Sequence, residues 1–173
     1  MEARQSIELD ILSRNTDTDQ FLTFLLAGEE YAIDILRVQE IKGWDNVTQI
    51  PNTPKYIKGV INLRGTIVPI VDLRLRFRLD PISYGQTTVV IVLKVEGEKG
   101  KRTMGIVVDA VSEVYNISDD GMKAAPDFGQ AISTDFVRGL ATVDEKMIIV
   151  LDIDKLLNAS VLDQIDESVA DVT

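Results

Sequence analysis

The sequence predicts a mainly β fold built from small barrels. Two observations lead to this prediction: many short apolar runs are separated by turn residues, and one of these segments recurs as a weak internal repeat. The chain has 173 residues, of which 45% are hydrophobic and 27% charged. It is therefore long enough to bury a core as one ordinary domain or as two very small ones.

The first elements are a variable tail, a hairpin and a short helix. Residues 1–19 mix charges with small polar side chains and read as a loose N-terminal tail. Residues 21–27 and 31–35 are apolar runs on either side of Gly28-Glu29, a pattern typical of a strand, a turn and a return strand. We expect a short helix over residues 36–41.

A second hairpin follows in the sequence. Residues 59–63 and 66–72 are apolar runs joined by Arg64-Gly65, and the glycine supplies the positive φ that a tight turn needs. Pro69 lies within the second run and cannot donate a ladder hydrogen bond. The strand is therefore expected to lie at a sheet edge or to be interrupted at Pro69.

The second half of the chain repeats this scheme. Strands are predicted at residues 87–95 and 103–108, joined by a charged loop at 96–102. Another hairpin is predicted to join residues 137–143 to residues 147–151 through a tight turn. Near the C-terminus, residues 159–173 are predicted to form an amphipathic helix, because apolar side chains recur at helical spacing: Val161, Leu162, Ile165, Val169 and Val172.

A gapless alignment of two segments suggests a structural duplication. Residues 32–41 align with residues 105–114 in their apolar pattern, with identities at Ile33/Ile106, Val38/Val111 and Glu40/Glu113. Each copy precedes a loop containing proline and then a hairpin.

The composition excludes several classes of function. Without cysteine or histidine the chain has no disulfide, zinc–thiolate site, Cys nucleophile or Ser-His pair. No apolar run approaches the ~20 residues of a membrane helix, and the N-terminus does not resemble a signal peptide, so we expect a soluble cytoplasmic protein.

The net charge of −10 is unevenly distributed, since residues 37–78 carry eight basic and three acidic side chains. This stretch is either an ordinary solvated surface or a face for an acidic protein partner. The acidic remainder argues against nucleic acid and against direct membrane binding.

The search for catalytic motifs returns little. Asp152-Ile153-Asp154 is a weak metal pattern, and Asp154 reads better as the N-cap of a short helix. Residues 97–103 lack the first glycine and the Ser/Thr of a phosphate-binding loop and read as a solvated hairpin loop. The sequence thus predicts a binding module with no catalytic residue, metal or cofactor. Two alternatives stay open, an unrelated small-ligand barrel with an aromatic-lined pocket and an enzyme using paired carboxylates.

Three residues are candidates for binding on local grounds. Arg64 at a hairpin tip either displays its guanidinium to a carboxylate partner or is an ordinary exposed turn residue. Val38 is either partly exposed or a core residue, and Phe128 is either an interface anchor or a plug beneath its Pro/Gly-flanked loop.

Five segments strongly resemble the CheW family of bacterial chemotaxis coupling proteins. They are residues 30–41, 52–74, 88–92, 105–109 and 152–157, and the most specific part reads KGVINLRG. The resemblance covers roughly residues 20–158 and implies two five-stranded SH3-like β-barrels packed together, with short connecting helices. The two subdomains are expected at about residues 20–83 and 84–158, and whether they exchange strands is left open.

The resemblance also implies a non-enzymatic adaptor role. Members of the family couple the cytoplasmic tip of methyl-accepting chemoreceptors to the regulatory domain of the histidine kinase CheA, in membrane-associated arrays where further CheW copies join the rings. A chemosensory pathway other than motility is an alternative within the family. By motif position, Val38, Glu40, Arg64 and Val114 match receptor-binding positions, whereas Gly59 and Phe128 match kinase or ring contacts.

Overall fold

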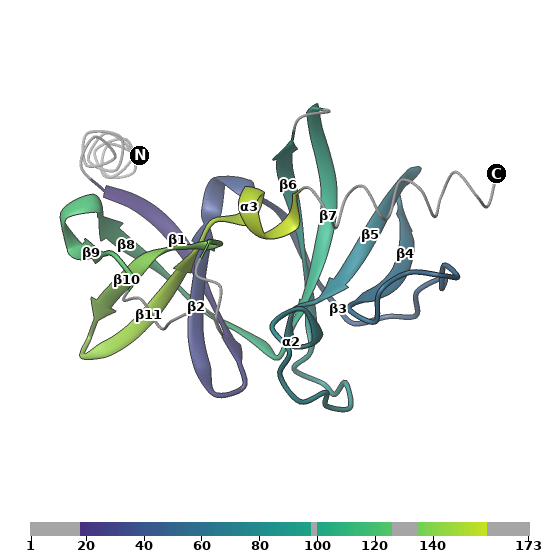
Figure 1. Ribbon diagram of the computed structural model, residues 1–173, viewed down its shortest axis with the longest axis horizontal. Coiled ribbons are helices and arrows are strands. Elements are labelled where there is room, and N and C mark those ends of the chain that lie inside the picture. The colour runs from purple at the N-terminus through teal and green to yellow at the C-terminus, as the bar shows by residue number, and fades with distance from the viewer. Residues whose placement is uncertain (1–17, 98–99, 126–134, 159–173) are drawn as a thin grey trace, which may run out of the picture.

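The computed structural model describes residues 18–97, 100–125 and 135–158, which form two β-sheets standing side by side (Figure 1). The first sheet has the strand order β8-β1-β2-β11-β10-β9 and the second the order β3-β6-β7-β5-β4. The first sheet consists of β8 (Ala110–Ser118), β1 (Thr18–Leu26), β2 (Glu29–Asp34), β11 (Lys146–Leu151), β10 (Val137–Val143) and the two-residue β9 (Met122–Lys123). The second consists of β3 (Val38–Gly43), β6 (Val89–Gly97), β7 (Gly100–Val108), β5 (Thr66–Asp72) and β4 (Ile57–Leu63). The predicted mainly β class is confirmed.

The first sheet is discontinuous in sequence, whereas the second is built from one continuous stretch of chain. The first sheet combines β1 and β2 with β8 to β11, and the second consists of β3 to β7. The chain crosses between them at η1 (Ile35–Arg37) and again at Asp109, between β7 and β8. The two sheets are therefore linked by chain crossings as well as by packing.

The internal repeat corresponds to equivalent places in the two sheets. Ala32 of β2 pairs in parallel with Val150 of β11, and Gly105 of β7 pairs in parallel with Ile70 of β5. A short helix follows each of these partner strands: α2 (Leu73–Arg76) after β5 and α3 (Ile153–Leu157) after β11. The same order of elements thus builds both sheets.

The two predicted tight turns are present. Arg64 and Gly65 join β4 to β5 with φ values of 50° and 88°, and Asp144 and Glu145 join β10 to β11 with φ values of 50° and 65°. Two successive residues at positive φ match the right-handed twist of the flanking strands. The sequence therefore sets the tip of the β4–β5 hairpin, where Arg64 lies.

Two local predictions were wrong. Residues 38–41 form strand β3, not a helix, because they pair with β6, and only residues 35–37 form a 3-10 turn. Much of the predicted charged loop at 96–102 is paired strand, since Glu96 lies opposite Lys101 and Val95 opposite Arg102.

Pro69 lies within an interior strand but at a place that tolerates it. Strand β5 has β4 on one side and β7 on the other, and its pairing with β7 begins at Ile70, one residue later. At Pro69, β5 is not yet paired with β7, so on the β7 side it is an edge strand there. The N–H that proline lacks is therefore not needed for pairing with β7.

The largest hydrophobic cluster lies between the sheets and draws on both. It includes Leu22 and Phe24 of β1, Leu93 of β6, Ile106 of β7 and Leu156 of α3, all at most 3% exposed. Two smaller clusters each belong to one sheet. Burial of this shared core, at about 25 cal/mol per Å² of apolar surface, holds the two sheets as one unit.

Candidate protein-binding surface

The second sheet ends in β3 on one side and β4 on the other, and an ion pair connects these two ends. Arg64, at the tip of the β4–β5 hairpin, places Nη2 2.7 Å from Oε2 of Glu40 in β3. The Arg64 side chain is 78% exposed and that of Glu40 31% exposed. Two of the predicted receptor-binding residues, 24 positions apart in sequence, therefore meet on the surface.

Two exposed apolar side chains lie on strands of the same sheet. Ile67 in β5 is 58% exposed, lies opposite Asn62 and belongs to the same hairpin as Arg64. Ile41 in β3 is 43% exposed, but its side chain points to the face of the strand opposite that of its neighbour Glu40. Val38, at the start of β3, is half-buried against the inter-sheet core. We call Val38, Glu40, Arg64 and Ile67 the β3–hairpin surface.

The two isoleucines were not identified from the sequence. Ile67 lies in an apolar run, whereas Ile41 lies between the charged residues Glu40 and Lys42. In both cases the exposure of the side chain depends on sheet pairing. The only usable signal was the hairpin at residues 64–65, which places Ile67 close to an exposed tip.

Gly59 has a structural reason for being glycine. Its φ is 142°, and a Cβ at this position would lie 2.2 Å from the carbonyl oxygen of Thr48. Thr48 and Val60 exchange backbone hydrogen bonds of 2.9 and 2.8 Å, which bring the chain after β3 against the outer edge of β4. A side chain at residue 59 would push this segment away from β4.

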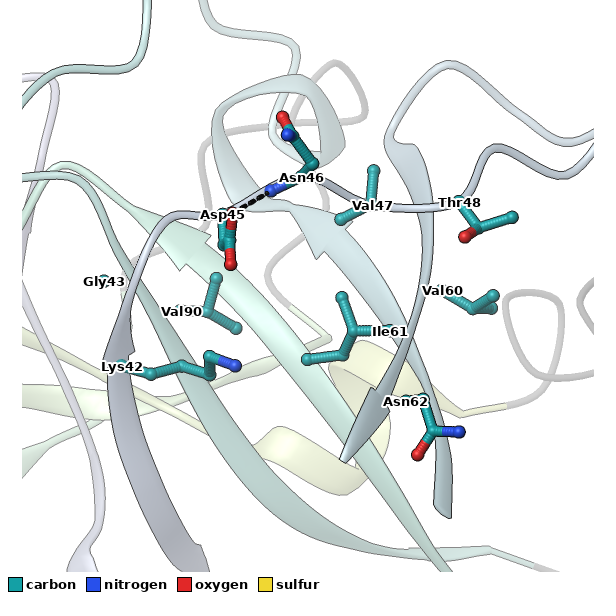
Figure 2. Close-up of a pocket in the computed structure, with 10 residues that line it drawn as sticks. All are labelled: Lys42, Gly43, Asp45, Asn46, Val47, Thr48, Val60, Ile61, Asn62 and Val90. Atoms are coloured by element: carbon teal, nitrogen blue, oxygen red, sulfur yellow. Dashed lines mark hydrogen bonds between the residues drawn. The ribbon is translucent and has the colours of Figure 1, made fainter. Parts of the chain in front are cut away.

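A pocket of about 180 Å³ opens between β3 and β4 (Figure 2). Lys42 lines it from β3, Asn62 from β4, and Asp45 and Asn46 from the segment between these strands. Lys42 and Asp45 are its ionisable side chains, and no aromatic residue lines it. It lacks both the aromatic lining expected of a small-ligand barrel and the facing carboxylates expected of an acid–base enzyme.

The remaining predicted site residues lie elsewhere. Val114 is in β8 of the first sheet, opposite Leu22, and is 49% exposed. The structure therefore places it on a different sheet from Glu40 and Arg64. Phe128 lies outside the described residues, as do residues 1–17 and the predicted C-terminal helix.

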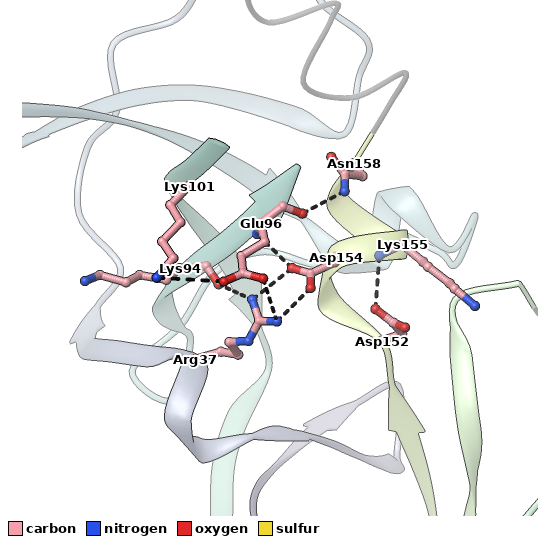
Figure 3. A network of polar contacts seen from close by, with 8 residues as sticks. All are labelled: Arg37, Lys94, Glu96, Lys101, Asp152, Asp154, Lys155 and Asn158. Atoms are coloured by element: carbon pink, nitrogen blue, oxygen red, sulfur yellow. Dashed lines mark hydrogen bonds and ion pairs between the residues drawn. The ribbon is translucent and has the colours of Figure 1, made fainter. Parts of the chain in front are cut away.

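The prediction that Asp154 caps a helix was wrong. The N-cap of α3 is Asp152, whose carboxylate accepts a hydrogen bond of 3.1 Å from the Lys155 N–H. The Asp154 carboxylate instead accepts two hydrogen bonds of 2.9 and 2.7 Å from the Arg37 guanidinium, and it also accepts a hydrogen bond from the Glu96 N–H (Figure 3). Within the described residues, no group of three or more acidic side chains could hold a metal ion.

A second ion pair lies at the place in the repeated architecture that corresponds to the Arg37–Asp154 pair. Here the short helix supplies the arginine and the crossing segment supplies the aspartate. Arg74 of α2 donates two hydrogen bonds of 2.8 Å to Asp109, where the chain crosses from the second sheet to the first. Burial alone would raise the pKa of Asp109, but hydrogen bonds from Arg74 and the Ala27 N–H lower it overall. Hydrogen bonding to Asp109 raises the pKa of Arg74, and hydrogen bonding to Asp154 likewise raises the pKa of Arg37. These bidentate, half-buried pairs fix the junction of the sheets.

The two pairs also explain part of the basic stretch at residues 37–78. Arg37 and Arg74 bind internal carboxylates, and Lys58 and Arg76 lie over the rings of Tyr84 and Tyr56. Much of this positive charge is therefore structural. Arg64 is the member whose side chain combines high exposure with an acidic neighbour on the same surface.

Comparison with known proteins identifies relatives across most of the chain. A family model described as CheW-like domain matches residues 20–161. The chemotaxis protein CheW of Klebsiella aerogenes is 48% identical over 155 residues, covering 90% of this chain and 91% of that protein. CheW of Treponema pallidum is 32% identical, covering 87% and 89% of the two chains.

A solved structure is also similar. The scaffolding protein TtCheW from Thermoanaerobacter tengcongensis matches with a TM-score of 0.74 and 35% sequence identity, covering 83% of this chain and 95% of that one. No helix in the described part of this chain is long and apolar enough to cross a membrane.

Proposed function

The chain belongs to the CheW-like domain family, and from this premise we propose that it couples chemoreceptors to the histidine kinase CheA. Membership of the family makes it a chemotaxis scaffold protein rather than an enzyme. The proposal adds the two partners: the cytoplasmic tip of a methyl-accepting chemoreceptor, and the regulatory domain of CheA. Further CheW copies are proposed as ring neighbours in cytoplasmic arrays beneath the membrane.

The observation that favours a receptor contact is the composition of the β3–hairpin surface. Exposed Ile67 supplies apolar contact area in the same hairpin as the highly exposed guanidinium of Arg64. A receptor tip is a helical hairpin, and an amphipathic helix binds such a surface through apolar anchors flanked by charge contacts. Val38 and Glu40, which border the same residues, are proposed to take part in this contact.

The charge of Arg64 supports the same proposal. In a chain of net charge −10, an exposed arginine provides a local attraction for an acidic partner. Its ion pair with Glu40 is exposed to water, so it can exchange for a carboxylate of the partner at small cost. Val114, Gly59 and Phe128 are proposed as further contacts on family grounds, with Gly59 acting through the strand edge that it shapes.

The experiment is a bridging assay. A receptor-tip fragment is immobilised, and the retention of the CheA regulatory domain is measured with and without this chain. We expect the regulatory domain to be retained only when the chain is present. An Arg64→Glu variant should reduce bridging, whereas Arg78→Glu, which makes the same charge change at another exposed turn position, should not.

Retention of the regulatory domain without the chain, or no retention in its presence, would contradict the proposal. Equal losses with Arg64→Glu and Arg78→Glu would assign the effect to net charge and remove Arg64 from the receptor surface.

A further inference from the structure

A seam runs between the two end strands of the second sheet, β3 and β4, which begin and end its strand order. The seam is closed in two places. Arg64 pairs with Glu40 at 2.7 Å, and the backbones of Thr48 and Val60 exchange hydrogen bonds of 2.9 and 2.8 Å. The pocket of about 180 Å³ opens between these two closures (Figure 2). We call it the seam pocket.

The seam pocket adjoins the β3–hairpin surface. Lys42, which lines the pocket from β3, lies two residues after Glu40 and therefore on the same face of that strand. Asn62 lines the pocket from β4, two residues before Arg64, and its Oδ1 accepts a hydrogen bond of 2.8 Å from the Gly65 N–H. A partner that contacts the hairpin tip therefore reaches the pocket as well.

The walls of the seam pocket are largely apolar and belong to the core of the second sheet. Val90 is 3% exposed within the hydrophobic cluster of this sheet, and Val47 and Ile61 are partly buried against the same cluster. At about 30 Å³ per water molecule, the pocket has room for about six waters. Releasing them from apolar walls favours the entry of an aliphatic stem.

Lys42 supplies a positive charge in this apolar surrounding. Its side chain extends from β3 across the pocket toward Ile61 (Figure 2). Among the described residues, no ion pair reaches its ammonium group. Asp45, the other ionisable side chain of the pocket, is exposed and accepts a hydrogen bond of 2.7 Å from the Asn46 N–H. The Lys42 ammonium can therefore bind an anionic group that enters the pocket.

We propose that the seam pocket binds the side chain of a glutamate on the receptor-tip helix that contacts Arg64. The methylene groups of the glutamate pack on the apolar walls, and its carboxylate accepts hydrogen bonds from the Lys42 ammonium. Glutamate suits the pocket better than aspartate, because it carries one more methylene group between the backbone and the charge. The inference rests on the proposed receptor contact and adds a second cation, with its own pocket, to that contact.

The test is a calorimetric titration of Lys42 variants of the full chain with the receptor-tip fragment. Lys42→Met keeps an unbranched stem but not the charge, and it should raise the dissociation constant at least about threefold. Lys42→Arg keeps the charge and should bind within about twofold of the unmodified chain. Lys123→Met makes the same charge change at an exposed position in β9 of the first sheet, and it should bind as the unmodified chain does.

A double-mutant cycle identifies the carboxylate. Each glutamate of the receptor-tip fragment is changed in turn to glutamine, and each fragment is titrated with the unmodified chain and with Lys42→Met. We expect one glutamate whose replacement weakens binding to the unmodified chain but has little further effect on Lys42→Met, because the two side chains form one contact.

Reductive methylation of lysines on the unmodified chain is a measurement that needs no variant. The receptor-tip fragment should slow the methylation of Lys42 and leave the rate at Lys123 unchanged. It decides the proposal even if Lys42→Met fails to fold.

Unchanged affinity in Lys42→Met, equal losses with Lys42→Met and Lys42→Arg, the absence of a coupled glutamate, or an unprotected Lys42 would each overturn the seam-pocket contact. Those results would leave the contact of Arg64 standing. A chain that does not bind the receptor tip at all would instead contradict the proposed function, and this inference with it.

Discussion

Reversing the charge of Arg64 should weaken receptor binding much more than it weakens the fold. In the folded chain, Arg64 loses one ion pair, with Glu40 at 2.7 Å. Two unit charges at this distance attract by about 1.5 kcal/mol in bulk water. Because both side chains are partly solvated and lose rotamer freedom on pairing, the net contribution of such a pair is about 0–1 kcal/mol. Including the new repulsion between two carboxylates, Arg64→Glu should lower the free energy of unfolding by about 1–2 kcal/mol.

The expected effect on binding is larger. A contact between Arg64 and a receptor carboxylate loses water when the helix docks, and removing one partner of such a pair costs about 1–3 kcal/mol. The dissociation constant should then rise about 5-fold to 150-fold. The measurement is calorimetric titration with a receptor-tip fragment, together with chemical denaturation of each variant.

The double exchange Glu40→Arg with Arg64→Glu separates two explanations. It rebuilds the internal ion pair in reverse, so the stability should return towards that of the unmodified chain. Receptor affinity should stay low, because the cation presented by the hairpin tip is still missing. Unchanged affinity in Arg64→Glu, or full recovery in the double variant, would refute a direct contact between Arg64 and the receptor.

Three further predictions concern the fold around the site. Gly59→Ala should lower the free energy of unfolding by about 1–3 kcal/mol in urea, since its Cβ meets a backbone carbonyl; an unchanged midpoint would contradict the close approach. The lowered pKa of Asp109 stabilises the fold at neutral pH, and this stabilisation is lost as pH falls through the folded pKa, which lies below 3.8. The unmodified chain should therefore exceed Asp109→Asn, which keeps a weaker bond to Arg74, in free energy of unfolding by an amount that is constant above about pH 5 and shrinks below it. A difference that does not change with pH would argue against the ion pair. Tyr84→Phe should cost about 1–3 kcal/mol in thermal unfolding, because it removes the donor to the buried carboxylate of Asp72; no loss would show that this hydrogen bond is dispensable.

Local signals in the sequence were sufficient for the hairpins. Arg64-Gly65 lies between two apolar runs, and a two-residue turn that includes glycine is a strong signal for a tight hairpin, here one with both residues at positive φ. Strand β3 was missed because residues 36–41, with leucine, arginine, glutamine and glutamate, favour a helix on intrinsic propensity. Pairing with β6, which the local sequence does not encode, overrides that preference.

The ion pairs between distant elements could not be predicted from local sequence. Nothing near Arg37 in the sequence indicates Asp154, 117 residues away, and a cap is the ordinary local reading of an aspartate before a short helix. Glu40 was identified through family motifs, and Arg64 both from its place at a hairpin tip and from those motifs. Their ion pair, however, depends on how β3 and β4 end the same sheet.

The coupling role is tested most directly by kinase control in a reconstituted mixture. Purified chain, a CheA-type kinase and receptor-tip fragments are combined, and autophosphorylation of the kinase is measured as the chain is titrated. We predict that phosphorylation comes under receptor control only when the chain is present, and that Arg64→Glu shifts the titration to higher concentration. A kinase whose rate ignores the receptor at every concentration of the chain would contradict the account.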